Sequence, residues 1–144
     1  MTHAINAAPI EKSFEIAAER CADISPLVYA KLFARCPEME ALFVRDTNGA
    51  IRGEMLYRVI DAIFDFLGPC SYAANFVQCE VVTHEGYGVP REVFGNFFDA
   101  LAETLKDLAA ADWSPAMNES WVALLADLAS ATPIPRRTPQ ALER

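Results

Sequence analysis

The chain has 144 residues, 53% of them hydrophobic, and a formal net charge of −8. This length predicts one domain, large enough to bury a core and still enclose a ligand. The acidic balance argues against binding to nucleic acid or to an anionic membrane surface. No apolar run reaches the roughly 18 residues that a membrane span needs, and the N-terminus lacks a secretory signal pattern. We therefore expect a cytoplasmic protein.

The cysteine pattern excludes two kinds of site. The spacings match no zinc motif, and the absence of Cys-x-x-Cys-His excludes covalent attachment of a c-type haem. In a reducing compartment, scattered cysteines are expected to be small core residues. They are Cys21, Cys36, Cys70 and Cys79.

Helical periodicity begins near the N-terminus and no strand-type alternation interrupts it. The first predicted helix covers residues 9–22. A second begins at Ser25, where a serine cap precedes a proline at the first helical position. Pro37 ends that helix and starts a short one over residues 38–42, and residues 46–49 have the composition of a turn.

The second half of the chain has longer helical patterns. A strong apolar stripe predicts a helix over residues 50–67, and further helices are expected over residues 72–84 and 90–110. Ser114 and the proline after it repeat the cap that opens a helix, here the last one. The proline- and arginine-containing segment 132–144 is predicted to be a flexible tail.

These elements predict an all-α domain over residues 1–131 with six to seven helices and short corners. Such a set can pack at ridges-into-grooves angles around an internal pocket, and a plain helical bundle is the alternative. The surplus of apolar residues could fill the core, line a cavity or form the interface of a homodimer.

The corner after residues 72–84 carries the most informative residue, His84. It closes a helix, glycines at positions 86 and 88 permit a sharp corner, and the other histidine, His3, lies at the extreme N-terminus. A neutral imidazole is the commonest protein ligand of transition metals and of haem iron. A histidine at this place can also simply complement the helix dipole, so both roles remain open from the residue alone.

Four segments are informative when taken together. They are Tyr29-Ala-Lys-Leu-Phe33 followed by Pro37-Glu38 and Leu42-Phe43; the helix with Arg52, Met55 and Leu56; His84-x-x-Tyr87-Gly88-Val89; and Trp113-Ser-Pro115 with Ser120-Trp121. In their order and spacing the chain resembles the globins, specifically the single-domain bacterial globins related to the haem domain of flavohaemoglobins. The resemblance implies a globin fold around a haem pocket, with haem b as the cofactor.

The resemblance also implies roles for particular residues in reversible binding of dioxygen or another diatomic gas, NO or CO. His84 would bind the iron, and its other ring nitrogen would donate to a backbone carbonyl. Phe43 would stack on the porphyrin, and Tyr29 would donate a hydrogen bond to the gas from the opposite side. The remaining positions expected to contact haem or ligand are Leu56, Val89, Phe94 and Phe97.

Two positions depart from the family pattern. The distal-helix position that usually holds glutamine or histidine falls at Arg52, or at Ile51 if the alignment shifts by one residue. We expect Arg52 at the pocket mouth, paired with a haem propionate or an acidic side chain. Four residues before His84, where the family tends to have leucine, stands Glu80. A carboxylate against an apolar macrocycle is unfavourable unless it reaches water or a cation.

Two rival functions follow from these departures. One is NO dioxygenase activity with an external reductase as electron donor. It is disfavoured because Phe94 replaces a tyrosine that supports the histidine in the flavohaemoglobin-like branch, and because no matching glutamate is found. The other is a haem-free sensory or structural module, which Glu80 would favour. The joint presence of His84, Phe43 and Tyr29 favours a gas-binding globin instead.

Overall fold

Residues 5–131 are the part of the chain that the computed structural model describes, and they contain helices and no strand. The elements are α1 (Ala7–Arg20), α2 (Ser25–Arg35), the 3₁₀ helix η1 (Pro37–Phe43), α3 (Ala50–Leu67), α4 (Ala73–Glu85), α5 (Glu92–Ala109), the 3₁₀ helix η2 (Ala110–Asp112) and α6 (Pro115–Ala131). The all-α prediction and the order of its helices are confirmed. The predicted tail over 132–144 lies outside the described residues.

The starts of α3 and α6 agree with the sequence, and the other predicted starts differ by a residue or two. Ser114 caps α6 as predicted, since its hydroxyl accepts a hydrogen bond from the Met117 N–H at 3.1 Å. At α2 the capping oxygen belongs instead to Asp23, which accepts from the Ser25 N–H at 3.0 Å. Ser25 is therefore the first residue of the helix rather than its cap.

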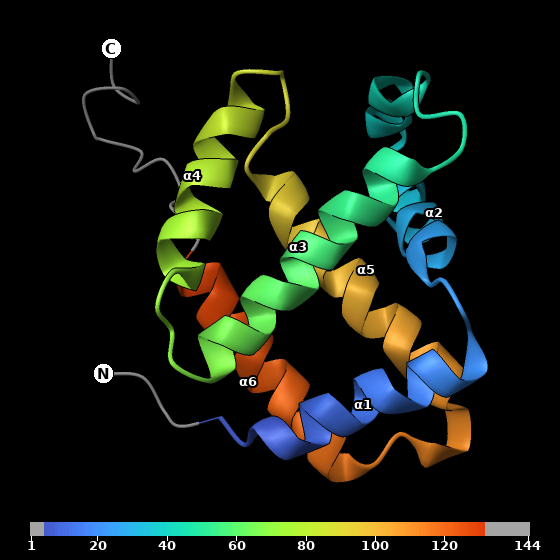
Figure 1. The fold of residues 1–144 in the computed structure, drawn as a ribbon, viewed down its shortest axis with the longest axis vertical. Coiled ribbons are helices and arrows are strands. Elements are labelled where there is room, and N and C mark those ends of the chain that lie inside the picture. Colours follow the sequence, from blue (N-terminus) through green and yellow to red (C-terminus); the bar gives the residue numbers. More distant parts are fainter. Residues whose placement is uncertain (1–4, 132–144) are drawn as a thin grey trace, which may run out of the picture.

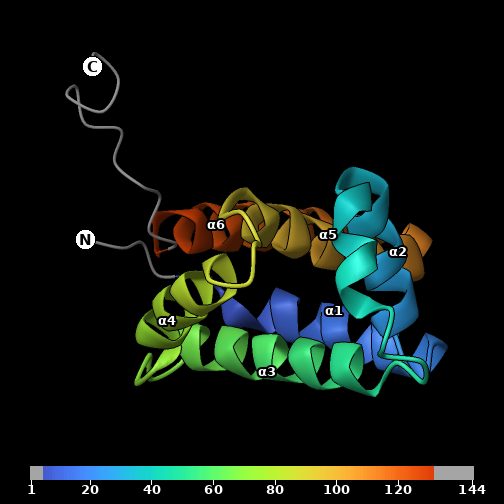
Figure 2. The same ribbon diagram turned by 90° about the horizontal axis from the view of Figure 1, so that it is seen from above.

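The helices form two layers. Figure 2 shows α1 and α3 on one side and α5 and α6 on the other, with α2 and α4 at opposite ends of the space between them; in Figure 1 α3 crosses in front of α5. Leu101 and Leu105 of α5 are fully buried, and Trp121 of α6 donates its ring N–H to Ser13 of α1 at 3.0 Å. A fully buried leucine contributes about 1.5–3 kcal/mol, so these contacts hold the layers together.

The cysteine prediction is correct for only part of the set. Cys36 is buried and Cys21 is half-buried, whereas Cys70 and Cys79 are exposed. Cys70 lies in the corner between α3 and α4 and has a left-handed backbone with φ of 52°, and Cys79 lies on α4. Because both positions face solvent, these cysteines are not core residues. Within residues 5–131 no helix is long and apolar enough to cross a bilayer.

Candidate functional site

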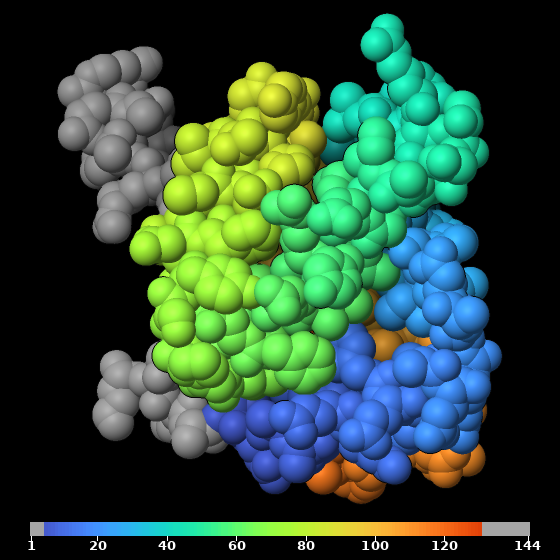
Figure 3. Space-filling model, in the orientation of Figure 1, coloured from blue at the N-terminus to red at the C-terminus, as the bar shows by residue number. Residues whose placement is uncertain are grey.

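A cavity of about 470 Å³ lies in the space between the two layers, lined by residues of α2, η1, α3, α4 and α5. Its size falls in the range of about 300–1,000 Å³ that is typical of pockets for small molecules and cofactors. The lining is mainly aliphatic and aromatic, with few polar groups. Figure 3 shows the surface hollowed between the corner that follows α4 and the segment around η1. The cavity is therefore suited to a mainly apolar ligand that reaches the surface at one edge.

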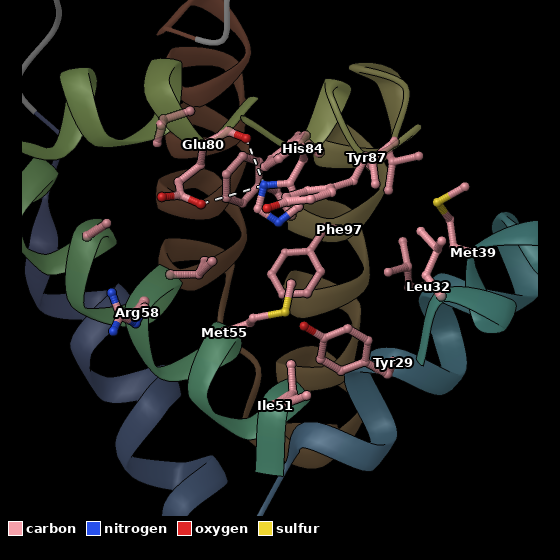
Figure 4. Close-up of a pocket in the computed structure, with 18 of the residues that line it drawn as sticks. Tyr29, Leu32, Met39, Ile51, Met55, Arg58, Glu80, His84, Tyr87 and Phe97 are labelled. Carbon is pink, nitrogen blue, oxygen red and sulfur yellow. Dashed lines mark hydrogen bonds and ion pairs between the residues drawn. The ribbon is translucent and has the colours of Figure 1, made fainter. Parts of the chain in front are cut away.

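His84 enters this cavity from the last turn of α4. Its Nδ1 lies 2.7 Å from the backbone carbonyl oxygen of Glu80. A carbonyl oxygen can only accept, so Nδ1 carries the hydrogen and Nε2 of the neutral ring keeps its lone pair. In Figure 4 the second ring nitrogen points into the cavity. The predicted hydrogen bond to a backbone carbonyl is confirmed, and the ring has the tautomer that a metal ligand needs.

The corner after α4 fixes the position of this histidine. Gly88 has a φ of 88°, a left-handed conformation that favours glycine. The turn it permits lets the Val89 N–H donate to the His84 carbonyl at 3.0 Å, and it brings Val89 into the cavity wall. Phe94 packs edge-on against the imidazole with ring centroids 5.4 Å apart. The backbone and one aromatic ring thus orient His84 together.

Tyr29 faces the same cavity from α2, on the opposite wall (Figure 4). Its side chain is 2% exposed, and its hydroxyl has no hydrogen-bond partner among the described residues. The phenol ring makes T-shaped contacts with the rings of Phe43 and Phe97, at centroid distances of 5.4 and 5.5 Å. Burial raises the pKa of Tyr29, so the group stays a neutral donor. An unsatisfied buried hydroxyl costs about 1–3 kcal/mol, which marks this site as unusual.

The face of α3 that lines the cavity differs by one residue from the expected one. Ile51 and Met55 line it, whereas Arg52 and Leu56 do not. Leu56 is buried in the core instead. Successive helical residues are rotated by about 100°, so a shift of one position moves a side chain from the cavity to another face. The alternative alignment that places Ile51 at the distal position is the one that agrees with this geometry.

Arg52 is bound to Asp46, a buried carboxylate, and does not line the cavity. From sequence, Asp46 was predicted only as part of a turn. Asp46 accepts hydrogen bonds from the backbone N–H groups of Ile51 and Arg52 and from Arg52 Nε, all at 2.9–3.0 Å. Burial alone would raise the pKa of Asp46, but these hydrogen bonds outweigh it and lower the pKa. Arg52 thus pairs with an acidic side chain, as expected. An aspartate shortly before a helix start, where N–H groups lack partners, was the signal for this role.

The other predicted site residues lie together around the cavity. Phe43, Val89, Phe94 and Phe97 all line it, along with Tyr29 and His84. The cavity is also lined by Arg45 and Arg58, which were not among the predicted site residues. Nothing in the local sequence distinguished them, because their approach to the cavity depends on how α3 and the loop before it are placed.

Comparison with known families accounts for this arrangement. The family model described as Globin matches residues 27–132, well over half of the chain. The chain belongs to the globin family. The matched region contains every residue selected for the site, from Tyr29 to Phe97. No curated protein matches the chain. Globins in general bind haem and a diatomic gas, and the predicted globin fold is confirmed for this member.

The residues of this globin fit a haem. Within the described residues no group of three or more His, Cys, Asp or Glu side chains could hold a metal ion. A haem needs only an axial ligand from the protein, because the macrocycle supplies the four equatorial ones. His84 provides a ring nitrogen free to bind, the cavity walls are apolar, and Tyr29 leaves a buried donor on the opposite wall.

Proposed function

We propose that this globin carries haem b and reversibly binds dioxygen, or another diatomic gas such as NO or CO. The observation that carries the proposal is the unpartnered hydroxyl of Tyr29, buried on the wall opposite His84. The haem, when bound, supplies the iron to which the gas attaches. The Tyr29 hydroxyl would then donate to a gas ligand that bears partial negative charge, which satisfies the buried side-chain donor that is left unpaired within residues 5–131.

The remaining residues bind and orient. His84 would hold the iron through Nε2, and Phe43 would lie against the macrocycle. Ile51 and Met55 of α3 would face the space for the gas and exclude water from it, which strengthens the hydrogen bond from Tyr29. These assignments keep the predicted roles of His84, Phe43 and Tyr29. The contact with the gas that was predicted for Leu56 is assigned to Ile51 and Met55 instead.

A different arginine from Arg52 is placed to contact the acidic groups of the haem. Arg45 lines the cavity and is exposed, so it could pair with a haem propionate at the edge of the pocket. Arg58 also lines the cavity, but its Nε already donates to Glu54 at 3.0 Å. We therefore assign the propionate contact to Arg45 rather than to Arg52.

A second candidate is NO dioxygenation driven by an external reductase. The specific observation in its favour is an oxygen of the Glu80 carboxylate 3.5 Å from Nδ1 of His84. A carboxylate beside the axial ligand would supply electronic support of the kind that a tyrosine at the Phe94 position gives in the flavohaemoglobin-like branch. Turnover of NO with a reductase and an electron source would distinguish this activity from reversible binding.

The test of haem binding uses reconstituted protein. Purified protein titrated with haem b should show a Soret band, and its reduced form should shift that band on addition of CO. His84→Ala should weaken haem retention by at least about tenfold, since it removes the axial ligand. His3→Ala is the matched control and should retain haem normally. Failure of the wild-type chain to give a Soret band, full retention by His84→Ala, or a low-spin bis-histidine spectrum would contradict the proposal.

A further inference from the structure

Glu80 is the acidic side chain that lines the cavity on the side of the axial histidine. It lies one turn before His84 on α4, and its carboxylate Oε1 is 3.5 Å from His84 Nδ1. The backbone carbonyl of the same residue accepts the Nδ1 hydrogen at 2.7 Å. Figure 4 shows the backbone carbonyl oxygen and one carboxylate oxygen of Glu80 directed at the same ring nitrogen of His84. One residue thus places a dipole and a full negative charge beside the same N–H group.

No arginine or lysine forms an ion pair with this carboxylate within the described residues, and its closest charged or polar partner there is the imidazole of His84. Of the two arginines that line the cavity, Arg58 donates to Glu54 at 3.0 Å and Arg45 has no contact with Glu80. The charge of Glu80 therefore faces the imidazole.

The distance decides how the carboxylate acts. At 3.5 Å it is long for a hydrogen bond, and the carbonyl at 2.7 Å already takes the hydrogen. A negative charge at this range still attracts positive charge on the ring, and solvent reduces the attraction because the Glu80 side chain is 39% exposed. The carboxylate stabilises positive charge that develops on the imidazole when Nε2 gives electron density to a metal. The ring is therefore a stronger donor than one held by a carbonyl alone.

We infer that Glu80 is a positioning residue for the axial ligand, which makes His84 a stronger donor to haem iron and favours the ferric over the ferrous state. This inference rests on the proposed haem binding. Glu80, which by its charge alone disfavours an apolar macrocycle, thus supports the histidine and supplies on α4 what the Phe94 position lacks. The carbonyl of residue 80 fixes the ring, and the carboxylate sets its electron donation.

The test compares charge removal with loss of the whole polar group. Glu80→Gln keeps the size and the backbone carbonyl but removes the charge. We expect the ferric-to-ferrous equilibrium to shift about tenfold toward ferrous, which corresponds to a midpoint about 59 mV higher for one electron. The iron–histidine stretching band of the ferrous protein should move to lower frequency. Glu80→Leu should shift both quantities in the same direction.

The matched control is Glu92→Gln, which removes an exposed carboxylate on α5 that does not line the cavity. It should change the equilibrium by less than about twofold. A His84-dependent Soret band with an unchanged midpoint in Glu80→Gln would overturn this inference alone. Equal midpoint shifts in Glu80→Gln and the control Glu92→Gln would also overturn it. So would tighter haem retention by Glu80→Leu at an unchanged midpoint. Absence of the Soret band from the wild-type protein would overturn the proposed function as well.

Discussion

His84 and Tyr29 face the cavity from opposite walls, and the protein holds their polar groups in different ways. On the α4 wall, the Nδ1 of His84 has a carbonyl at 2.7 Å and a carboxylate oxygen at 3.5 Å. On the α2 wall, the hydroxyl of Tyr29 has no partner among the described residues, although its side chain is almost completely buried. One wall fixes its functional group with the protein's own atoms, and the other leaves its group unsatisfied.

This difference is what a site for two successive ligands requires. A group that must hold a metal permanently gains from a fixed orientation and tautomer, which hydrogen bonds to its other ring nitrogen supply. A group that must respond to a gas has to remain free until the gas arrives, so the folded protein carries the cost of an unpaired hydroxyl. The contrast predicts that changes on the two walls affect stability and function in opposite ways.

The largest effect is expected from removing the unpaired donor in the gas complex. Tyr29→Phe should speed dioxygen release by about tenfold or more, because it removes one hydrogen bond to the ligand in a dry pocket. Carbon monoxide is less polar when bound, so its release should change much less. Stopped-flow measurements of both release rates provide the check. Equal changes for the two gases would show that Tyr29 acts through its bulk alone.

The same substitution should have the opposite effect on the haem-free protein. Tyr29→Phe removes a buried hydroxyl without removing a hydrogen bond, so we expect the free energy of unfolding to rise by about 1 kcal/mol. Urea unfolding of the haem-free protein measures this. Tyr57→Phe is the matched control because Tyr57 is exposed, and it should change little. Destabilisation by Tyr29→Phe would mean that the hydroxyl has a partner.

Acid should weaken the segment that leads into α3. The pKa of Asp46 is lowered in the folded state, so its contribution to stability is present above the ordinary carboxyl pKa of about 3.9 and is lost as the pH falls through the folded value. Asp46→Asn should therefore be less stable than the wild type at about pH 7, with a smaller difference at about pH 3. Urea unfolding at both pH values checks this. The exposed Glu119→Gln control should show no such pattern, and a constant difference for Asp46→Asn would contradict the role of its charge.

The smallest effect on gas release is expected at Arg52. Its guanidinium is engaged with Asp46 and does not line the cavity, so Arg52→Ala should leave dioxygen release within about twofold of the wild type. Loss of its contacts should instead loosen the start of α3 and raise the rates of gas entry or haem loss. Flash photolysis and haem transfer would measure these rates. A large acceleration of dioxygen release would place Arg52 beside the gas after all.

Local sequence determined the helices and the corner that carries His84. The helix over 50–67 was predicted with its observed bounds, since an apolar stripe and a flanking glycine specify it without help from the rest of the chain. The glycine at position 88 permits a turn that local backbone sterics favour. His84 was singled out by its place at the end of a helix, whereas Tyr29 and Phe43 were selected by the resemblance to globins.

Tertiary structure decided which side chains of those helices meet. The choice between Ile51 with Met55 and Arg52 with Leu56 depends on the rotation of α3, which is fixed by its packing and by the bonds of Asp46 rather than by its own sequence. The missing partner of Tyr29 could not be read from the sequence either, because a hydroxyl is unpaired only with respect to all the atoms around it. Glu80 combines both levels. Its place one turn before His84 follows from the helix itself, and the tertiary structure decided that this pair of side chains lines the cavity.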